Sequence, residues 1–564
     1  MHGLLSCFGQ PLGPVSGDPA EAFKDVFLRY SDNGLMGTDQ LRRFLMEVQG
    51  DELEGVGSQD LGFKCFQGGG LDLDAFFRYL SSDDNPPLDP SLGVHQDMNA
   101  PLSHYFIYTG HNSYLTGNQL SSESSDVPII KALQRGVRVI ELDLWPNSSK
   151  TDAEVRHGRT LTTPVVLSKC LKSIKEHAFD VSPYPVIITL EDHLTSNLQA
   201  KVAEMLKETF GDLLFYPSTE FLDEFPSPED LKYRVLISTK TPKELLESKS
   251  INENYRELQK ETKEVEHYHS EHYQKEEEHD ANNQSPNHPI AHEYKHLISI
   301  ASRKGKGELI NWLKGNVNKV TRLSLNELLF EKLVASHGPE LIRFTQKNIL
   351  RIYPKGTRIT SSNYNPLPGL MYGAQMVALN MQGYGRSLWL MHGFFRANGG
   401  CGYIKKPDFL LKTCPHSMVF DPLATSPVKK TMKIKVYHGN GWLWDSKKTH
   451  FSLYSPPVFY TKKQLYCEIL GTDKSVYRVS KKTKKIENWT PIWNEKFVFE
   501  LRVPELALLR IKVHKLNVSG KDSFGGQTCL PVSELRQGIR SVPLFDHKGN
   551  KLKSVKLLMH FEFV

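Results

Sequence analysis

Four oxygen-bearing side chains in the first half of the chain have the types and spacing of a metal site. Glu141 and Asp143 are two residues apart in an apolar stretch that reads as a strand, so their side chains share one face. Two carboxylates in an apolar interior are costly unless a cation neutralises them. Together with Asn112 and Glu191 they form an all-oxygen set, which suits Ca²⁺ better than Zn²⁺.

Two histidines, His111 and His157, lie near these residues in the sequence, and each is next to a glycine. A single histidine is more commonly a packed residue than a catalyst. Two histidines beside a cation site suit phosphodiester cleavage, because one can stabilise phosphoryl charge while the other protonates the leaving oxygen. A Ca²⁺ bound to the attacking hydroxyl would lower its pKa. In a non-catalytic alternative, the strand carboxylates simply pair with Arg135 or Arg138.

Residues that could bind phosphate occur further along the chain. Lys240 follows a predicted strand end, and Lys243 lies close to it. Ser324 precedes Arg351 by 27 residues, and Tyr353 belongs to the same apolar segment as Arg351. Each residue alone is a weak signal, since most lysines and arginines are solvated on the surface. Their value depends on whether the fold brings them together.

The elements that must position these residues alternate between short apolar runs and helical patterns. This alternation is typical of a parallel α/β fold, and at this length a (β/α)₈ barrel is the leading candidate. The candidate site residues fall at strand ends, where barrel enzymes place their sites. Similar patterning resumes at about residue 294 and runs to about 411. The first half predicts strands at 137–143, 185–190 and 234–238, and helices at 129–135, 169–177 and 198–210.

The segments around the barrel have different patterns. Apolar spacing predicts helices around 20–28, 41–48 and 73–80, and the loop at 31–39 resembles an EF-hand but lacks its alternating acidic ligands. We therefore expect a structural helix pair there. Residues 244–280 contain 12 acidic and five basic residues, which predicts a solvated linker. This linker is either inert or screens the mouth of the site from an anionic membrane.

From residue 431 the apolar period becomes two, which predicts an all-β sandwich with strands at 432–436, 497–501, 509–513 and 556–561. The expected organisation is thus a multidomain chain with a split barrel. It consists of a flexible N-terminus (1–18), EF-hand-like helices (19–98), the first barrel half (99–243), an acidic low-complexity linker (244–293), the second barrel half (294–412), a linker (413–429) and the sandwich (430–564).

Composition and charge limit the class of protein. The 564 residues are 39% hydrophobic and 24% charged, which excludes collagen-like, wholly disordered and disulfide-scaffold classes. The seven cysteines form no CxxC motif, so we expect free thiols in the cytoplasm. We find no apolar run of about 20 residues and no signal-peptide pattern. Residues 430–564 carry 25 basic and 11 acidic residues, a net charge of +14, which indicates an anionic partner.

The candidate segments resemble the phosphoinositide-specific phospholipase C family over nearly the whole chain. The first half resembles its X box at 111–115, 141–143, 157–158 and 190–193. The second half resembles its Y box at 351–356, 361–366 and 398–403, and the sandwich resembles a C2 domain. The short arrangement, with the segments at 117–122 and 525–531, is similar to the plant type.

This resemblance implies a reaction and assigns a role to each candidate residue. Glu141 or Glu191 would take the proton of the inositol 2-hydroxyl, which attacks the 1-phosphate. His111 would stabilise the phosphorane charge, and His157 would protonate the departing diacylglycerol and then act in reverse to hydrolyse the cyclic phosphate. Ca²⁺ would be held by Asn112, Glu141, Asp143 and Glu191, and the head group by Lys240, Ser324, Arg351 and Tyr353, with Lys243 as a further candidate.

The sequence departs from the family pattern at several positions. Pro242 replaces an expected second lysine, for which Lys243 is a possible substitute. Arg159 and Thr357 replace aromatic residues that contact the membrane in animal relatives, and Leu120 remains a candidate for that contact. In the C2 calcium loops the acidic positions hold Asn440, Ser452, Val458, Asn517 and Ser523, with Asp522 alone retained.

One carboxylate cannot hold Ca²⁺ against water, so the C2 domain is expected to bind anionic membrane through charge. The basic run that would make this contact comprises Lys481, Lys482, Lys484 and Lys485. Near an anionic leaflet each cation contributes ~1 kcal/mol. The alternative is a basic sandwich that only packs on the barrel.

The sequence therefore predicts a Ca²⁺-dependent phospholipase C that cleaves PI(4,5)P₂, and also PI4P or PI, in membrane signalling. We expect a monomer that associates peripherally with the plasma membrane. Two alternatives stay open, namely another barrel phosphodiesterase, such as a glycerophosphodiesterase, and a non-catalytic lipid-binding scaffold. Nucleic-acid binding is not expected, because the basic run lacks interleaved aromatic residues for base stacking.

Overall fold

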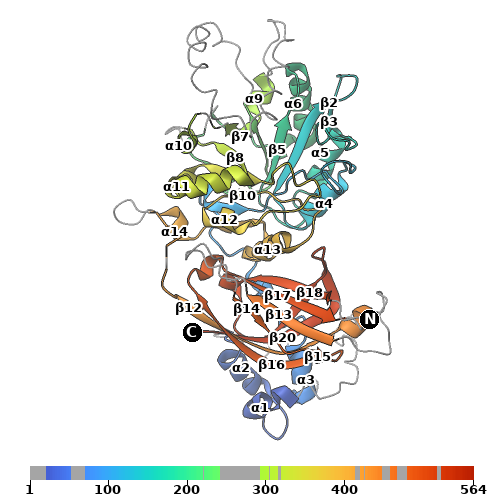
Figure 1. The fold of residues 1–564 in the computed structure, drawn as a ribbon, viewed down its shortest axis with the longest axis vertical. Helices are drawn as coiled ribbons and strands as arrows, with labels where there is room; N and C mark the ends of the chain where they lie inside the picture. The colour runs from blue at the N-terminus through green and yellow to red at the C-terminus, as the bar shows by residue number, and fades with distance from the viewer. Residues whose placement is uncertain are drawn as a thin grey trace.

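The computed structural model describes residues 21–51, 70–219, 222–241, 292–303, 305, 307–314, 319–412, 419–424, 426–446, 458–465, 479–516 and 522–564. In Figure 1 the α/β part lies at the top, a β-rich part lies below it, and the helices α1, α2 and α3 lie at the bottom. The predicted N-terminal segment 1–18 lies outside the described residues, as do 244–291 of the predicted acidic linker.

The α/β part is a closed ring of parallel strands, which confirms the predicted (β/α)₈ barrel. Each strand pairs in parallel with the next, and an isolated parallel bridge between Thr109 and Val139 closes the ring. Each strand–helix crossover covers the outside of the ring, which is how parallel strands bury both faces. The ring strands are β1 (Tyr105–Ile107), β2 (Val139–Pro146), β5 (Val186–Asp192), β6 (Val235–Lys240), β7 (Ile298–Arg303), β8 (Arg322–Asn326), β9 (Ile349–Tyr353) and β10 (Met376–Val377).

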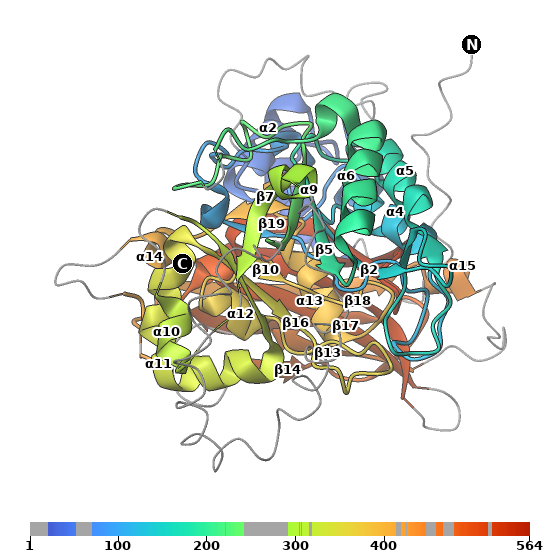
Figure 2. The same ribbon diagram turned by 90° about the horizontal axis from the view of Figure 1, so that it is seen from above.

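Three antiparallel strands and a layer of helices complete the barrel. The strands β3 (Ala153–Val155) and β4 (Val165–Val166) extend β2, and β11 (Tyr403–Lys405) pairs with β1. Figure 2 shows α5, α6 and α11 outside the strands. The helices are α4 (Val127–Gln134), α5 (Leu167–His177), α6 (Ser196–Phe210), α9 (His292–His296), α10 (Leu309–Leu313), α11 (Glu327–Lys347), α12 (Leu367–Met371), α13 (Arg386–Phe394) and α14 (Asp408–Leu411).

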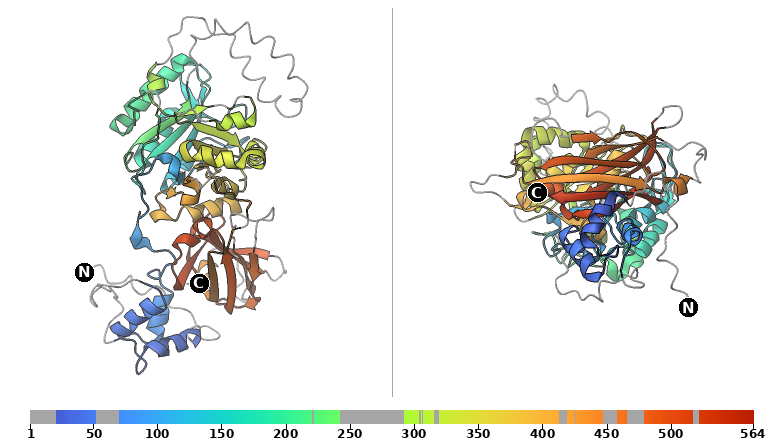
Figure 3. Two further views of the ribbon diagram at one scale, coloured as in Figure 1. Left: turned by 90° about the vertical axis from the view of Figure 1, so that its left-hand side faces the viewer. Right: turned by 90° about the horizontal axis from the view of Figure 1, so that it is seen from below.

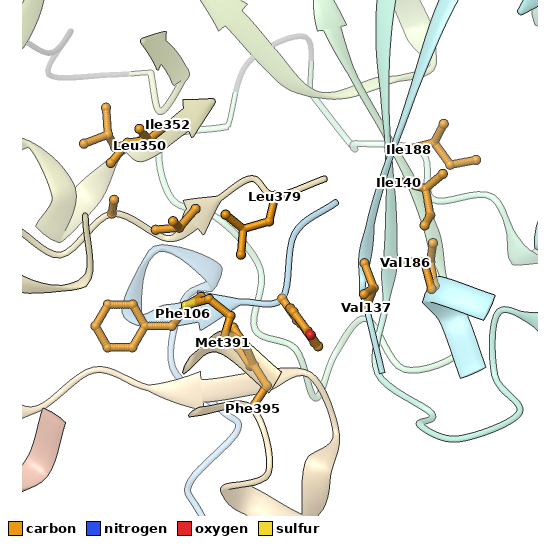
Figure 4. Close-up of a cluster of buried hydrophobic side chains, with 14 of the residues drawn as sticks. Phe106, Val137, Ile140, Val186, Ile188, Leu350, Ile352, Leu379, Met391 and Phe395 are labelled. Carbon is orange, nitrogen blue, oxygen red and sulfur yellow. The ribbon is translucent and has the colours of Figure 1, made fainter. Parts of the chain in front are cut away.

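An apolar shell between strands and helices holds the barrel together. Alternate strand residues such as Ile140 and Ile188 face outward into it, and Phe106 on β1 belongs to the same cluster as Met391 and Phe395. Figure 4 shows these side chains with Val137, Val186, Leu350, Ile352 and Leu379. Burying an aliphatic side chain contributes about 1.5–3 kcal/mol, so this shell is the main source of barrel stability.

The inside of the barrel changes from apolar to polar along the strands. At one level Val139, Ile187 and Leu236 are register partners in an apolar cluster. Two residues further along, the partners are Glu141, Thr189 and Ser238. Because side chains on one face recur every second residue, the polar layer lies above the apolar one, at the carboxyl ends of the strands.

The second part is an antiparallel β-sandwich, as predicted. The strand order is β14-β13-β17-β18-β19-β20-β12-β16, and β18 joins β19 only at the pair Gln527 and Phe545. Apolar residues from both sides of this junction, such as Ile511 and Met559, form one core. The strands are β12 (Lys430–Asn440), β13 (Val458–Leu465), β14 (Val479–Lys482), β15 (Ile486–Glu487), β16 (Ile492–Leu501), β17 (Leu508–Leu516), β18 (Asp522–Pro531), β19 (Gly538–Phe545) and β20 (Lys551–Phe563), with a short helix α15 (Trp442–Ser446).

Helix α13 connects the two parts. It lies between the barrel and the sandwich and packs on β18 (Figure 3, left). At Gly393 an added Cβ would lie 2.3 Å from the Cβ of Cys529, so only glycine permits this approach. The indole nitrogen of Trp389 donates to the carbonyl of His547 at 2.8 Å. The barrel and the sandwich therefore pack as one unit.

The helices α1 (Glu21–Tyr30), α2 (Thr38–Glu47) and α3 (Leu73–Leu80) match the predicted helical region and dock on the sandwich. Their apolar cluster includes Tyr437, Ile539 and Leu558 from the sandwich. Figure 3 (right) shows these helices against the strands. Among helices of the described segments, none has both the length and the apolar character needed to cross a membrane.

This docking depends on one buried arginine. Arg540 donates to the Gln49 carbonyl at 2.6 Å and to Asp51 Oδ1 at 2.7 Å. We expect Arg540→Met to lower the free energy of unfolding by about 3 kcal/mol, because the Gln49 carbonyl and Asp51 lose a buried donor, and Asp51 keeps only its pair with Arg536. Urea unfolding measures this loss. Lys433→Met, which breaks the exposed pair with Glu562, is the control and should cost less than about 1 kcal/mol. An equal, small loss in both variants would contradict the prediction.

Candidate active site

Three of the predicted metal ligands meet at the carboxyl ends of β2 and β5. Glu141, Asp143 and Glu191 each place a carboxylate oxygen within 4.8 Å of the others. Asp143 and Glu191 are register partners on the neighbouring strands, and Glu141 lies two residues before Asp143. Glu141 and Asp143 are buried, whereas the Glu191 side chain is half exposed. The tertiary fold thus brings together carboxylates that are 50 residues apart in the sequence.

This carboxylate cluster fits a cation. Asp143 Oδ1 is buried and has no hydrogen-bond partner in the described part of the chain. Burial, and then the charges of Glu191 and Glu141, raise the pKa of Asp143 well above its usual value. A bound cation would supply the missing partner and the missing positive charge. The donors are all oxygen atoms, as Ca²⁺ prefers.

Asn112 lies beside the cluster and is almost fully buried. Its backbone N–H donates to Glu141 Oε2 at 3.1 Å, and its side-chain nitrogen donates to Gln119 Oε1 at 2.8 Å. Its φ of 41° is a left-handed conformation that asparagine tolerates better than most residues. The amide oxygen is therefore the end of this side chain that Gln119 leaves available.

The cation that pairs with Glu141 in this structure is Arg351, which corrects the alternative drawn from the sequence. Arg351 Nη2 donates to Glu141 Oε1, and both side chains are buried. Arg138 instead donates to backbone carbonyls, including that of Ala178 at 2.6 Å, and Arg135 donates to the carbonyl of Lys548 at 3.0 Å. Sequence distance favoured the near arginines, whereas the ring places β9 within reach of β2.

Both predicted histidines lie at the same mouth, and each has its Nδ1 atom engaged. His111 Nδ1 lies 2.9 Å from Asn380 Oδ1, and His157 Nδ1 lies 2.6 Å from the carbonyl oxygen of Gln119. Since both partners are oxygen atoms that accept, each Nδ1 carries the proton of the neutral ring and Nε2 stays available. Burial lowers the pKa of His111.

The predicted phosphate-binding residues line the same mouth, with one exception. Ser324 and Arg351 are register partners on β8 and β9, and Ser324 Oγ is buried with no hydrogen-bond partner among the described residues. Tyr353 ends β9, and its ring is nearly parallel to that of His111 with centroids 6.4 Å apart. Lys240 is exposed at the end of β6. Lys243 lies outside the described residues.

The structure adds residues that sequence reasoning missed. Arg322 lies two residues before Ser324, is fully buried, and donates to Thr189 Oγ1 at 3.1 Å. Burial lowers its pKa to about 9. Asn380 supports His111, and Gln119 supports His157. Only weak sequence signals marked them, because arginine, asparagine and glutamine in loops and strand ends are common.

Exposed apolar side chains form a rim beside the histidines. Leu120, the residue predicted for membrane contact, is 46% exposed. Leu161 is 79% exposed and Ile359 is 50% exposed, and neither was singled out in the sequence. The Leu161 N–H donates to the Leu120 carbonyl, and the Gln119 N–H donates to the Ile359 carbonyl, both at 2.8 Å. Three separate loops therefore join into one apolar edge.

The predicted C2 loop positions that the structure describes lie at or next to the ends of sandwich strands. Asn440 ends β12, and Val458 and Asp522 begin β13 and β18. Leu516, at the end of β17, is the register partner of both Val458 and Asp522. Ser452 and Asn517 lie outside the described residues, and Ser523 belongs to β18. Lys481 and Lys482 belong to β14, and Lys484 and Lys485 are exposed beyond its end.

Comparison with known proteins matches the same regions. Residues 98–241 and 311–409 match the families described as Phosphatidylinositol-specific phospholipase C, X domain and Y domain, and residues 430–545 match the C2 domain. The chain is 54% identical to phosphoinositide phospholipase C 2 of Arabidopsis thaliana, covering 99% of this chain and 98% of that protein. It is 55% identical to phosphoinositide phospholipase C 6 of the same plant, covering 94% and 89%.

A solved structure is also similar. The crystal structure of PLC21 from L. pealei has a TM-score of 0.74 and 26% identity, and the match covers 96% of this chain and 68% of that chain. The similarity therefore includes the helices, the barrel and the sandwich together. The predicted fold class and family resemblance are both confirmed.

Gly158, next to His157, offers a test of the site geometry. An added Cβ there would lie 2.0 Å from the Trp145 ring, which stacks on His193 with centroids 4.0 Å apart. We expect Gly158→Ala to displace this ring and the adjacent His157, and to lower phospholipase turnover at least 10-fold, because small misplacements of reacting groups are costly. Phospholipase assays and tryptophan fluorescence measure the two effects. Ser148→Ala, at an exposed position after β2, is the control, and equal activity of both variants would contradict the prediction.

Proposed function

The chain belongs to the phosphoinositide-specific phospholipase C family and is a phospholipase C, and from that premise we propose that it cleaves PI(4,5)P₂ in a Ca²⁺-dependent reaction. The products would be diacylglycerol and inositol trisphosphate, which act in membrane signalling. The observation that carries this proposal is convergence. Carboxylates, oriented histidines and phosphate-binding groups from both halves meet at one mouth of the barrel.

The head group would bind between the two halves of the barrel. Ser324 Oγ is a buried hydroxyl with no partner in the described chain, and Arg351 lies opposite it with a second guanidinium edge beyond its pair with Glu141. Both groups suit phosphate oxygens. Tyr353 offers a ring face for the inositol, and Lys240 adds positive charge at the rim. PI4P lacks one of the two ring phosphates of PI(4,5)P₂, and PI lacks both, so these lipids should bind less well.

The histidines would act through their Nε2 atoms. With Nδ1–H of His111 donating to Asn380, the ring would take up a second proton when the phosphate binds, and its Nε2–H would stabilise negative charge on the phosphoryl group. His157, whose Nδ1–H is held by the Gln119 carbonyl, would act as the imidazolium and donate its Nε2 proton to the diacylglycerol oxygen. It would then take a proton from water to open the cyclic phosphate.

The carboxylates would hold the cation and accept a proton. Asn112, Glu141, Asp143 and Glu191 would hold Ca²⁺, which would lower the pKa of the inositol 2-hydroxyl and offset phosphate charge. Glu141 or Glu191 would accept the proton of that hydroxyl. Glu141 pairs with Arg351, so the metal site and the head-group site share one buried ion pair.

The proposed membrane contact has two parts. The apolar rim of Leu120, Leu161 and Ile359 would enter the lipid beside the mouth. The C2 domain would add charge-based binding to anionic lipid through Lys484, Lys485 and their neighbours Lys481 and Lys482. These contacts would hold the enzyme at the cytoplasmic face of the plasma membrane, with the barrel mouth toward its substrate.

The reaction is tested by the release of water-soluble inositol phosphates from vesicles that contain PI, PI4P or PI(4,5)P₂. We expect release to require Ca²⁺, to be fastest with PI(4,5)P₂, and to fall about 100- to 1,000-fold in His111→Ala, because a group that stabilises transition-state charge is lost. His177→Gln, a substitution on α5, is the matched control and should retain activity. Release that does not depend on Ca²⁺ would contradict the proposal. Absence of release despite vesicle binding would favour a lipid-binding scaffold.

The C2 contact is tested by binding of the full chain to vesicles with and without phosphatidylserine. We expect binding without Ca²⁺, and Lys484→Gln with Lys485→Gln should weaken it about 30-fold, because two cations contribute about 2 kcal/mol near an anionic surface. Lys172→Gln with Lys175→Gln, on exposed positions of α5, removes the same charge elsewhere and is the control. Binding that needs Ca²⁺, or that persists unchanged in high salt, would overturn this part of the proposal.

A further inference from the structure

Gln119 contacts two proposed site residues and the support of a third, although it has no role in the reaction described above. It lies in the loop between His111 and α4 and is 7% exposed. Its side chain contacts Asn112 and Asn380, and its carbonyl oxygen accepts from His157. Its N–H donates to the Ile359 carbonyl at 2.8 Å. One residue of the first barrel half is therefore hydrogen-bonded to His157, to the support of His111 and to the second half.

The direction of these hydrogen bonds can be traced from a backbone group. The carbonyl of Gly117 can only accept, so the Ser361 hydroxyl donates to it at 2.7 Å. Having used its proton, Ser361 Oγ must accept from its second neighbour, the Gln119 side chain, at 2.9 Å. That atom is therefore the nitrogen Nε2 of Gln119, and the other end of the amide is the oxygen Oε1.

The same reasoning fixes the orientation of Asn112. Because Gln119 Oε1 can only accept, the Asn112 atom that lies 2.8 Å from it is the nitrogen Nδ2. The amide oxygen of Asn112 then points away from Gln119 and is left as a metal ligand. Gln119 thus decides which end of Asn112 is available beside Glu141.

A second branch of this hydrogen-bond network reaches His111. Gln119 Nε2 also donates to Asn380 at 3.1 Å, which identifies the accepting atom as Asn380 Oδ1. His111 Nδ1 lies 2.9 Å from the same oxygen, so it must be protonated in the neutral ring. His111 Nε2 is then the ring nitrogen that Asn380 leaves available, and it carries a proton only in the doubly protonated ring.

We propose that Gln119 is a positioning residue that orients two polar groups of the site. It turns the Asn112 oxygen toward the cation position and fixes the proton of the neutral His111 ring on Nδ1. Through its carbonyl it also holds His157 in the same tautomer. This inference rests on the proposed function for the meaning of these orientations, but the orientations themselves are measurable without substrate. A residue that merely packs the loop would not fix them.

Two substitutions at Gln119 separate the branch to Asn112 from the branch to Asn380 and His111. Gln119→Glu keeps an acceptor for Asn112 but loses the donor to Asn380, so Asn380 should turn its amide nitrogen toward the new carboxylate and toward His111. We expect the His111 proton to move to Nε2, with Ca²⁺ binding not weakened. Gln119→Met loses both branches, and we expect the Kd for Ca²⁺ to rise 10- to 100-fold as well, as for other supports of metal ligands.

The readouts are ¹⁵N shifts of labelled histidine rings, calorimetry with Ca²⁺ alone, and kcat and KM on PI(4,5)P₂ vesicles. The His111 signal is identified by its loss in His111→Gln. We expect kcat to fall 10- to 100-fold in both variants with KM changed less than 3-fold. Gln382→Met is the matched control, because Gln382 also donates to Ser361 Oγ and the Gly117 carbonyl, both at 3.3 Å. It should match the wild type within 2-fold.

The outcomes are distinguishable. The proposal is overturned if the folded Gln119→Met variant keeps wild-type Ca²⁺ affinity, histidine tautomers and kcat. It is also overturned if neither Gln119 variant folds, since Gln119 is then a structural residue of the loop. If only Gln119→Glu folds, a His111 proton on Nε2 supports the proposal, and a proton that stays on Nδ1 overturns it. A wild-type protein without Ca²⁺ binding or lipid cleavage would overturn the proposed function, whereas its Nδ1-protonated His111 would still support the role of Gln119.

Discussion

The structure depends above all on carboxylates held at the mouth of the barrel. Glu141 and Asp143 are buried, and Glu191 lies beside them at the rim. Such a group of like charges is unfavourable without compensation, and the raised pKa of Asp143 expresses that cost. Arg351 neutralises part of the charge, and Asp143 Oδ1 remains as a position for a cation. The arrangement is stable only because the apolar shell around the strands supports it.

The site is assembled from two halves that are distant in sequence. The first half supplies the carboxylates and both histidines, and the second half supplies Arg351, Ser324 and Asn380. The ring of strands places β9 three strands from β2 around one lumen, within reach of a single ion pair. The loop at Gln119 adds a second connection between the halves. Activity should therefore respond to any change in how the halves meet.

Much of the fold followed from periodicity. Strands and helices of the first half lie within a few residues of their predicted bounds, and the helix predicted at 73–80 is α3. The change to a period of two at residue 431 marked the sandwich. Packing between the parts was not predictable, because contacts such as Gly393 against Cys529 and Arg540 against Asp51 join positions far apart in the chain. Periodicity reports which face of an element is buried, not what covers it.

The sequence by itself determined the chemistry of the site, because carboxylates and histidines at strand ends could be recognised from residue type and spacing. It also determined the barrel, the sandwich and the family. Only the tertiary structure decided which residues form ion pairs and hydrogen bonds with these site residues. Arg351 rather than Arg135 or Arg138 faces Glu141, and Gln119 and Asn380 orient the reacting groups. The reason is physical, since the partner of a buried charge is set by distance across the closed barrel, and distance along the chain carries little information about it.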